Sequence, residues 1–451
     1  MTPIPLDLAG HSRLLLYNRG KYPKLIRWLT LYPLYAIAEI AIIATDLAEL
    51  LGSAIALVLL FPKLELWHGV LITAIDVFVV LLMGDPLSKR PSRPFEIFIA
   101  FMVVAVLICM SIITSQIGVL WGYTFQGYLP SKYVFSSGGL YAAIGIIGAT
   151  VMPHSLFLGS ALATQDRINM KPLGDEEFSK AANRTNSSLV PQSAPQRMMA
   201  DMQTSIGNFF KAPPASGHAT EVTRHSEHEN NTYDFVRAHV YHGMIDMTIS
   251  LLGFAVVINS MILILASTVF FYGDGRGHEG PAGLFDAYDL IKTYIGKAAA
   301  VLFAIALLAS GQSASFVATL AGQAVAEGFI RWRVSAVMTR LLTRSLAMIP
   351  SMIVAIAMGR EGVDALLVAS QVVLSIVLPF VTFPLLYCTS SKTIMRCKKT
   401  PKDGDINDPE CSEEWVYFNN NMLMMIIGWS IWLLIVIANT YVLISMAMDA
   451  S

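Results

Sequence analysis

Long apolar runs alternate with polar loops over most of this chain. The nine apolar segments lie at about residues 31–61, 66–84, 95–116, 138–163, 236–272, 298–326, 336–358, 363–388 and 421–448. A helix of about 20 apolar residues can cross a bilayer, so the pattern predicts a polytopic all-α membrane protein with about nine transmembrane segments. Several runs are longer than one crossing needs, which predicts tilted or extended helices. The runs are continuous rather than alternating, and this excludes a transmembrane barrel.

Charge in the loops predicts the orientation of these segments. Residues 1–30 are basic, and the cation-rich loops around 89–93, 331–333 and 392–402 lie on the same side if the segments cross in turn. The positive-inside rule therefore predicts a cytoplasmic N-terminal segment at 1–30 and a cytoplasmic loop at 389–420. The last helix and the C-terminus then occupy 421–451.

A polar insert at 164–235 divides the transmembrane part into residues 31–163 and 236–388. The insert is rich in Ser, Asn, Gln and Pro and has few aromatic residues. Such a composition cannot bury a core, so the insert is predicted to be a disordered cytoplasmic loop.

Composition narrows the class of protein further. Of the 451 residues 55% are apolar and only 14% are charged, against about 25% charged residues in soluble domains. The 31 basic and 32 acidic residues leave a net charge of −1, so the expected partner is the lipid bilayer and not a nucleic acid. The four cysteines have no CxxC spacing, which argues against a disulfide framework or a zinc site. The sequence shows no nucleophile–base constellation and no HExxH motif, so neither an enzyme nor a cofactor is predicted.

The fourth apolar segment contains a helix breaker in the run GATVMPHS. Pro153 has no N–H, so the carbonyl of Ala149 loses its helical partner. Inside a bilayer such a carbonyl has to be satisfied, and a bound cation, a neighbouring helix or a water can each do this. Met152 and His154 flank the break and make a cation site one of these alternatives.

Three carboxylates share one face of the first apolar segment: Glu39, Asp46 and Glu49. Carboxylates at membrane depth are costly unless they line water, pair with a cation or bind protons. A proton pathway and a structural ion pair both remain open here. Arg344, one turn inside its segment, is a candidate partner for Asp46 or Glu49.

Five stretches resemble the third, sixth, eighth, ninth and tenth helices of the NRAMP family of divalent-metal transporters, in that order. They are AEIAIIATDLAELLGSAIAL, GATVMPHSLFLGSAL, LLASGQSASFVATLAGQ, LTRSLAMIPS and SQVVLSIVLPF. MPHS followed by a glycine, and the long loop after the sixth helix, look like the fungal branch. The resemblance implies a LeuT-like inverted repeat that moves manganese, ferrous iron and related ions together with protons.

The same resemblance implies roles for individual residues. The metal would be held by the Ala149 carbonyl and the Met152 sulfur and approached by Gln371. The residues that match the family's proton pathway are Asp46, Glu49, His154 and Arg344. A thioether favours soft transition ions over calcium and magnesium, in agreement with this assignment.

The sequence also departs from the family. It has no DPGN motif, which carries the other metal ligands in the family's first helix. We therefore expect a chain truncated at its N-terminus, without the first helix and most of the second, and with impaired transport. Two alternatives remain: a non-transporting membrane metal sensor or partner subunit of a full-length transporter, and a LeuT-like carrier of an organic solute. Each is a multi-pass protein of the plasma, endosomal or vacuolar membrane.

Overall fold

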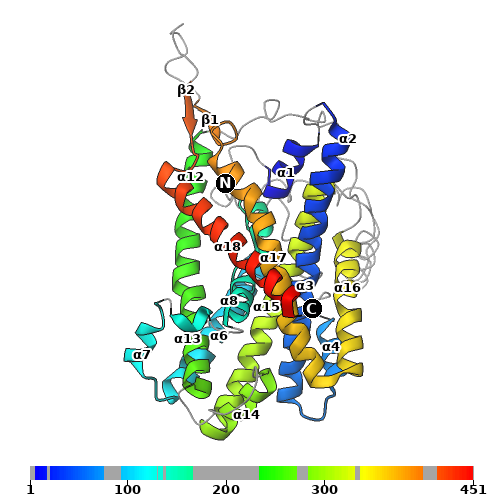
Figure 1. Cartoon of the computed structure of the whole chain (residues 1–451), viewed down its shortest axis with the longest axis vertical. Helices are drawn as coiled ribbons and strands as arrows, with labels where there is room; N and C mark the ends of the chain where they lie inside the picture. The colour runs from blue at the N-terminus through cyan, green and yellow to red at the C-terminus, as the bar shows by residue number, and fades with distance from the viewer. Residues whose placement is uncertain are drawn as a thin grey trace, which may run out of the picture.

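The protein is a bundle of long helices that run along its longest axis (Figure 1). The computed structural model describes residues 6–17, 21–75, 93–129, 131–135, 139–165, 233–271, 283–330, 336–399 and 414–449. Most of the polar insert predicted at 164–235 lies outside these residues.

In chain order the elements are α1 (Leu8–Leu16), α2 (Pro23–Ile26), η1 (Arg27–Leu31), α3 (Tyr32–Leu60), α4 (Leu66–Thr73), α6 (Arg93–Gln116), α7 (Trp121–Gln126), η2 (Lys132–Phe135), α8 (Gly139–Thr150), α9 (Pro153–Leu162), α12 (Tyr233–Ile249), η4 (Ser250–Ala255), α13 (Val256–Ala266), η5 (Ser267–Phe271), α14 (Leu284–Tyr294), α15 (Lys297–Ile330), α16 (Ala336–Ala357), α17 (Gly359–Ser390), β1 (Arg396–Lys399), β2 (Glu414–Tyr417) and α18 (Met422–Asp449).

Seven helical stretches among the described residues are long and apolar enough to cross a membrane. Seven of the nine predicted segments match them. The segment predicted at 336–358 forms α16, whose apolar part, Leu341–Ala357, is shorter than the other spans. The segment predicted at 66–84 begins as α4, and its second half lies outside the described residues. The seven spans are Pro23–Leu60, Phe95–Gln116, Gly139–Leu162, Tyr233–Phe271, Lys297–Ile330, Gly359–Ser390 and Met422–Ile444.

Helix α3 is the most enclosed of these spans and packs against α15, α17, α4 and α16. Glycines allow its backbone to approach its neighbours closely. A Cβ added to Gly311 of α15 would lie 3.3 Å from the carbonyl oxygen of Glu49. A Cβ added to Gly69 of α4 would lie 2.8 Å from the carbonyl oxygen of Ala54. The carboxylates predicted on α3 are therefore held in the middle of the bundle.

Two regions predicted to be polar segments contain regular structure. Within residues 1–30, α1 buries Leu8 and Ala9 in the core, and the first span already begins at Pro23, a residue type suited to the first turn of a helix. Within 389–420, β1 and β2 form an antiparallel pair with Cys397 opposite Val416. The predicted all-α class is confirmed for the bundle, and this short pair is its one addition among the described residues, formed because these residues find backbone partners across the loop.

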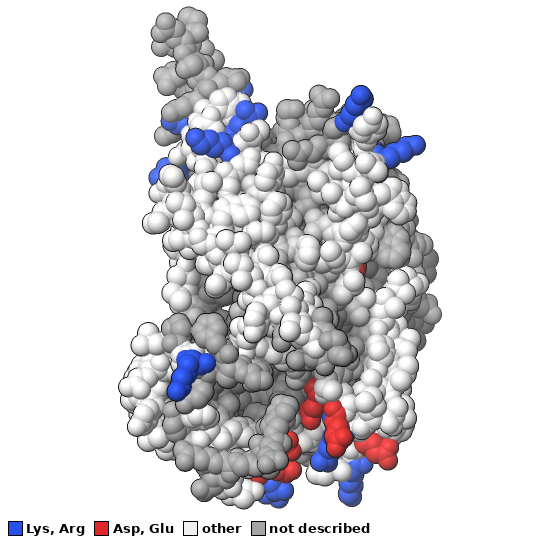
Figure 2. Space-filling model, viewed as in Figure 1, with Lys and Arg blue, Asp and Glu red and all other residues white. Residues whose placement is uncertain are grey.

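Charged side chains gather at the ends of the bundle (Figure 2). In this view lysine and arginine lie at both ends, near α2 and the β-hairpin and near α7 and α14, while the acidic side chains lie mainly at the end with α14. The middle of this face shows few charges, which agrees with a membrane-spanning bundle.

Candidate functional site

The helix predicted to break at Pro153 is interrupted there. Helix α8 ends at Thr150, and α9 starts at Pro153 with Met152 as an extended N-cap residue, at φ −70° and ψ 121°. Because Pro153 has no N–H, it cannot donate to the carbonyl of Ala149. The half-buried Met152 and the Ala149 carbonyl therefore lie together at the break.

Helix α17 packs directly against α8 at Gly148, the residue before Ala149. A Cβ added to Gly148 would collide with the carbonyl oxygen of Gln371 and would lie 2.7 Å from the backbone nitrogen of Ser375. The structure thus brings the backbone of Gln371 next to the broken helix. The Oε1 atom of Gln371 is buried and has no hydrogen-bond partner among the described residues.

A buried ion pair joins α16 to α3. Arg344 donates from Nη1 to Oδ1 of Asp46, and both side chains are almost fully enclosed. Its Nη2 donates to the carbonyl of Thr73 in α4 at 3.2 Å. Glu49 lies one turn beyond Asp46, within electrostatic reach of both charges. One arginine is therefore placed beside two carboxylates, an arrangement typical of functional sites inside membranes.

His154 is held by a residue that the sequence analysis did not single out. The Thr45 hydroxyl donates to the carbonyl of Ala41 at 2.9 Å and lies 3.2 Å from Nδ1 of His154. When the hydroxyl donates to Ala41, its oxygen accepts from Nδ1–H of His154, which selects one tautomer of the ring. Nε2 of the neutral ring is then an acceptor, and it is buried with no partner among the described residues.

Glu39, the remaining acid on this face of α3, has a different partner from Asp46. The hydroxyl of Tyr35, one turn earlier on the same helix, donates to Glu39.

The Thr45 contact could have been suspected because Thr45 directly precedes Asp46. The Thr73 carbonyl left no signal in the sequence, because any residue type offers the same backbone oxygen.

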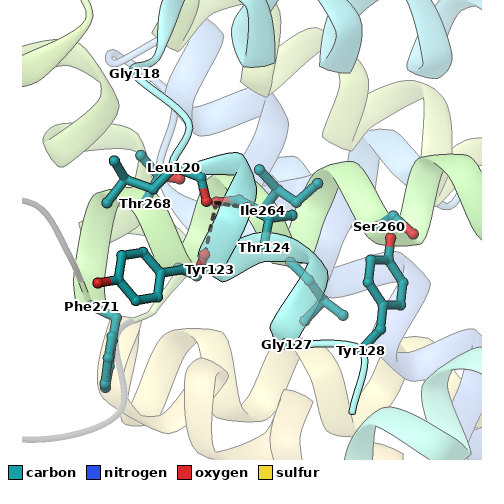
Figure 3. A pocket seen from close by; sticks show the side chains of 12 residues that line it. Gly118, Leu120, Tyr123, Thr124, Gly127, Tyr128, Ser260, Ile264, Thr268 and Phe271 are labelled. Atoms are coloured by element: carbon teal, nitrogen blue, oxygen red, sulfur yellow. Dashed lines mark hydrogen bonds between the residues drawn. The ribbon is translucent and has the colours of Figure 1, made fainter.

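A cavity of about 520 Å³ lies apart from these residues, between α7 and the α13–η5 segment (Figure 3). Tyr123, Tyr128 and Phe271 line it, and Thr124 donates to the carbonyl of Leu120 at 3.2 Å at its edge. No charged side chain and none of the predicted site residues lines it. It is therefore not the candidate ion site.

Interrupted helices at mid-membrane are how secondary transporters expose backbone carbonyls to an ion. The break between α8 and α9, next to buried charges, places this chain in the class of multi-pass membrane transporters. The family model described as natural resistance-associated macrophage protein-like, Nramp, matches residues 18–193 and 215–402. The chain belongs to the Nramp family, as its motifs predicted.

Relatives in fungi and bacteria are similar to nearly the whole chain. The manganese transporter pdt1 of Schizosaccharomyces pombe is 35% identical over 448 residues, which cover 99% of this chain and 75% of the relative. The iron transporter SMF3 of Saccharomyces cerevisiae is 34% identical over 93% of this chain and 81% of its own length. The divalent metal cation transporter MntH of Listeria welshimeri is 34% identical over 91% of this chain and 72% of its own.

The fold is also similar to solved structures. The crystal structure of the Eremococcus coleocola manganese transporter, in complex with an aromatic bis-isothiourea substituted compound, matches with a TM-score of 0.64 at 27% identity. The match covers 97% of this chain and 74% of that structure. The chain thus has the LeuT-like architecture of Nramp transporters.

Proposed function

We propose that this chain moves divalent transition-metal ions, manganese or ferrous iron, across a membrane together with protons. The relatives described above are named manganese, iron and divalent metal transporters. The metal ion and the proton are the substrates, and the lipid bilayer is the solvent of the bundle.

The observation that carries the proposal is the break between α8 and α9 against α17. The Ala149 carbonyl has lost its helical donor, and Oε1 of Gln371 is buried with no partner among the described residues. Two oxygens that need a positive partner therefore come from helices that touch at Gly148. The Met152 sulfur adds a soft ligand, which favours manganese, iron and similar ions over calcium.

The proton pathway is assigned to the charges beside the break. Asp46 and Glu49 accept the proton, and Arg344 stabilises their negative charge through its bond to Asp46. His154 lies on α9 and faces α3 through Thr45, so its Nε2 can pass a proton between the two helices. Proton movement and metal binding are thereby coupled through α9.

Metal uptake by reconstituted protein tests the ligand assignment. Met152→Ala is expected to lower manganese uptake at least tenfold and to weaken the exclusion of calcium, because the soft ligand is lost. The matched control is Met424→Ala on α18, since Met424 is 61% exposed and distant from the break in the chain. Unchanged manganese uptake with unchanged calcium exclusion would show that Met152 is not a ligand.

The alternative that the sequence left open is a non-transporting metal sensor, or a partner subunit that assembles with a full-length transporter. Uptake by the purified chain alone decides between the two, because a sensor or partner subunit gives none.

A further inference from the structure

Helix α17 contains a proline about two turns after Gln371 and remains continuous through it. Pro379 lies inside the helix and has no N–H, so the carbonyl of Ser375, one turn earlier, loses its helical donor. In a membrane-spanning helix another group has to satisfy this carbonyl.

The donor comes from α18. Nδ2 of Asn439 donates to the Ser375 carbonyl at 2.9 Å. The Ser375 hydroxyl donates back to Oδ1 of Asn439 at 3.0 Å. Both side chains are buried, with 6% of Asn439 and 1% of Ser375 exposed. One carboxamide thus replaces the hydrogen bond that Pro379 removes and adds a second bond to the same residue.

A third bond holds α18 to this part of α17. Nε1 of Trp432, two turns before Asn439, donates to the carbonyl of Pro379 at 2.9 Å. Figure 1 shows α18 crossing α17, and α18 also contacts α8. Asn439 and Val442 are the buried residues of α18 among those whose burial is described, on a helix that otherwise faces outward.

The bonded turn is the one that touches the broken helix. The backbone nitrogen of Ser375 and the carbonyl of Gln371 belong to one helical turn, and both pack against Gly148. The chain of contacts therefore runs from Asn439 through Ser375 to the residue before Ala149.

We propose that Asn439 is a positioning residue for metal transport: it bonds the Ser375 carbonyl freed by Pro379 and so fixes the turn of α17 that holds Gln371 against the broken helix. This inference rests on the proposed function for its transport consequences. Its structural step concerns only α17 and α18.

The test replaces Asn439 and follows two properties. Asn439→Leu is similar in size and compatible with lipid but makes neither bond. We expect the KM for manganese uptake to rise about tenfold, since a buried carbonyl is left without a donor. Cys388 is a free thiol, 2% exposed, near the far end of α17. We expect its alkylation by a membrane-permeant maleimide, located by mass spectrometry, to become about tenfold faster as α17 loosens around Pro379.

Two further variants sharpen the result. Thr440→Val is the matched control, because Thr440 is exposed and its hydroxyl bonds only within α18. The double variant Asn439→Leu with Pro379→Ala restores a backbone N–H for the Ser375 carbonyl, so the alkylation rate should return towards that of the wild type. An alkylation rate that stays high in the double variant would overturn the role of the freed carbonyl.

The outcomes separate this inference from the proposed function. If the wild type takes up no manganese, the proposed function fails, while the alkylation rates still decide whether Asn439 fixes this turn of α17. If Asn439→Leu keeps a wild-type alkylation rate, or keeps a wild-type KM in a transporting protein, Asn439 does not position the site.

Discussion

Arg344 and Asp46, 298 residues apart in the sequence, form a buried ion pair that joins α16 to α3. Arg344 also bonds the Thr73 carbonyl, so a single side chain connects three helices. The pair occupies the same level of α3 as Glu49 and Thr45, and Thr45 in turn holds His154. Structure and proposed proton chemistry therefore depend on the same few groups.

Breaking this pair should cost stability. Asp46→Asn or Arg344→Gln leaves one buried charge without its partner, which costs about 3–5 kcal/mol. We expect each single variant to unfold at a markedly lower temperature in detergent. The double variant should recover part of the loss, because both members of the pair are removed and only Glu49 is left as a charged group beside it.

The double variant Asp46→Asn with Arg344→Gln tests transport apart from stability. It lacks the carboxylate and the guanidinium of the proposed proton pathway, so manganese uptake should no longer respond to an imposed pH gradient. Lys292→Gln, an exposed position on α14, is the control for loss of one charge. A well-folded double variant with uptake still driven by a pH gradient would remove Asp46 and Arg344 from the pathway.

The Thr45 hydroxyl should matter through His154. Thr45→Val removes the acceptor for Nδ1–H, so the ring is no longer held in one tautomer. We expect the maximal rate of uptake to fall about tenfold, in line with a buried group left unsatisfied, at an unchanged KM for manganese. Thr45→Ser keeps the hydroxyl and should transport normally. Equal rates for the Val and Ser variants would contradict the role of this contact.

The contact at Gly148 predicts a position-specific effect on α8. Gly148→Ala forces a methyl group against α17 and should cost about 1–3 kcal/mol through overpacking. It should also abolish most manganese uptake, because Gln371 is pushed from the break. Gly145→Ala, one turn earlier, is the matched control, since nothing lies within 4 Å of a Cβ there. Stability and manganese uptake are measured on the same reconstituted samples. Equal losses in the Gly148→Ala and Gly145→Ala variants would argue against the contact.

Asp7 lies outside the membrane spans, and its raised pKa predicts that the stability of the protein depends on pH. Burial raises the pKa of Asp7 from 3.8 to about 6, the bond from the Gly10 N–H opposes this, and the charge of Glu327 adds to it. The folded state then holds the proton more tightly than the unfolded state. Stability from the packing of α1 is therefore full below the unfolded pKa and decreases as pH rises through the folded value.

Asp7→Asn tests this sign. The amide oxygen can still accept from Gly10 N–H, but no charge forms. We expect the unfolding temperature of the wild type to fall relative to that of the variant as pH is raised from about 4 to about 7. Parallel curves would mean that Asp7 does not carry the dependence.

Several features of the fold and site could be predicted from local sequence. The break was predicted from the missing N–H of Pro153 in its run of small residues, whereas Pro379 lies within the continuous helix α17. Ala149, Met152 and Gln371 were proposed as ligands because short motifs match the family, and the structure brings the backbone of Gln371 next to the break. The choice of Asp46 over Glu49 as partner of Arg344 could not be predicted, since both acids share a helix face.

By itself, the sequence determined the apolar segments, the interruption at Pro153 and the family, because each depends on residues that are contiguous or nearly so. Only the tertiary structure decided which distant groups meet. Asn439 looks like any polar residue in an apolar helix until it is seen 2.9 Å from the Ser375 carbonyl, 64 residues away. A carbonyl freed by proline can be satisfied from any neighbouring helix, and the packing of the bundle selects the one that reaches it.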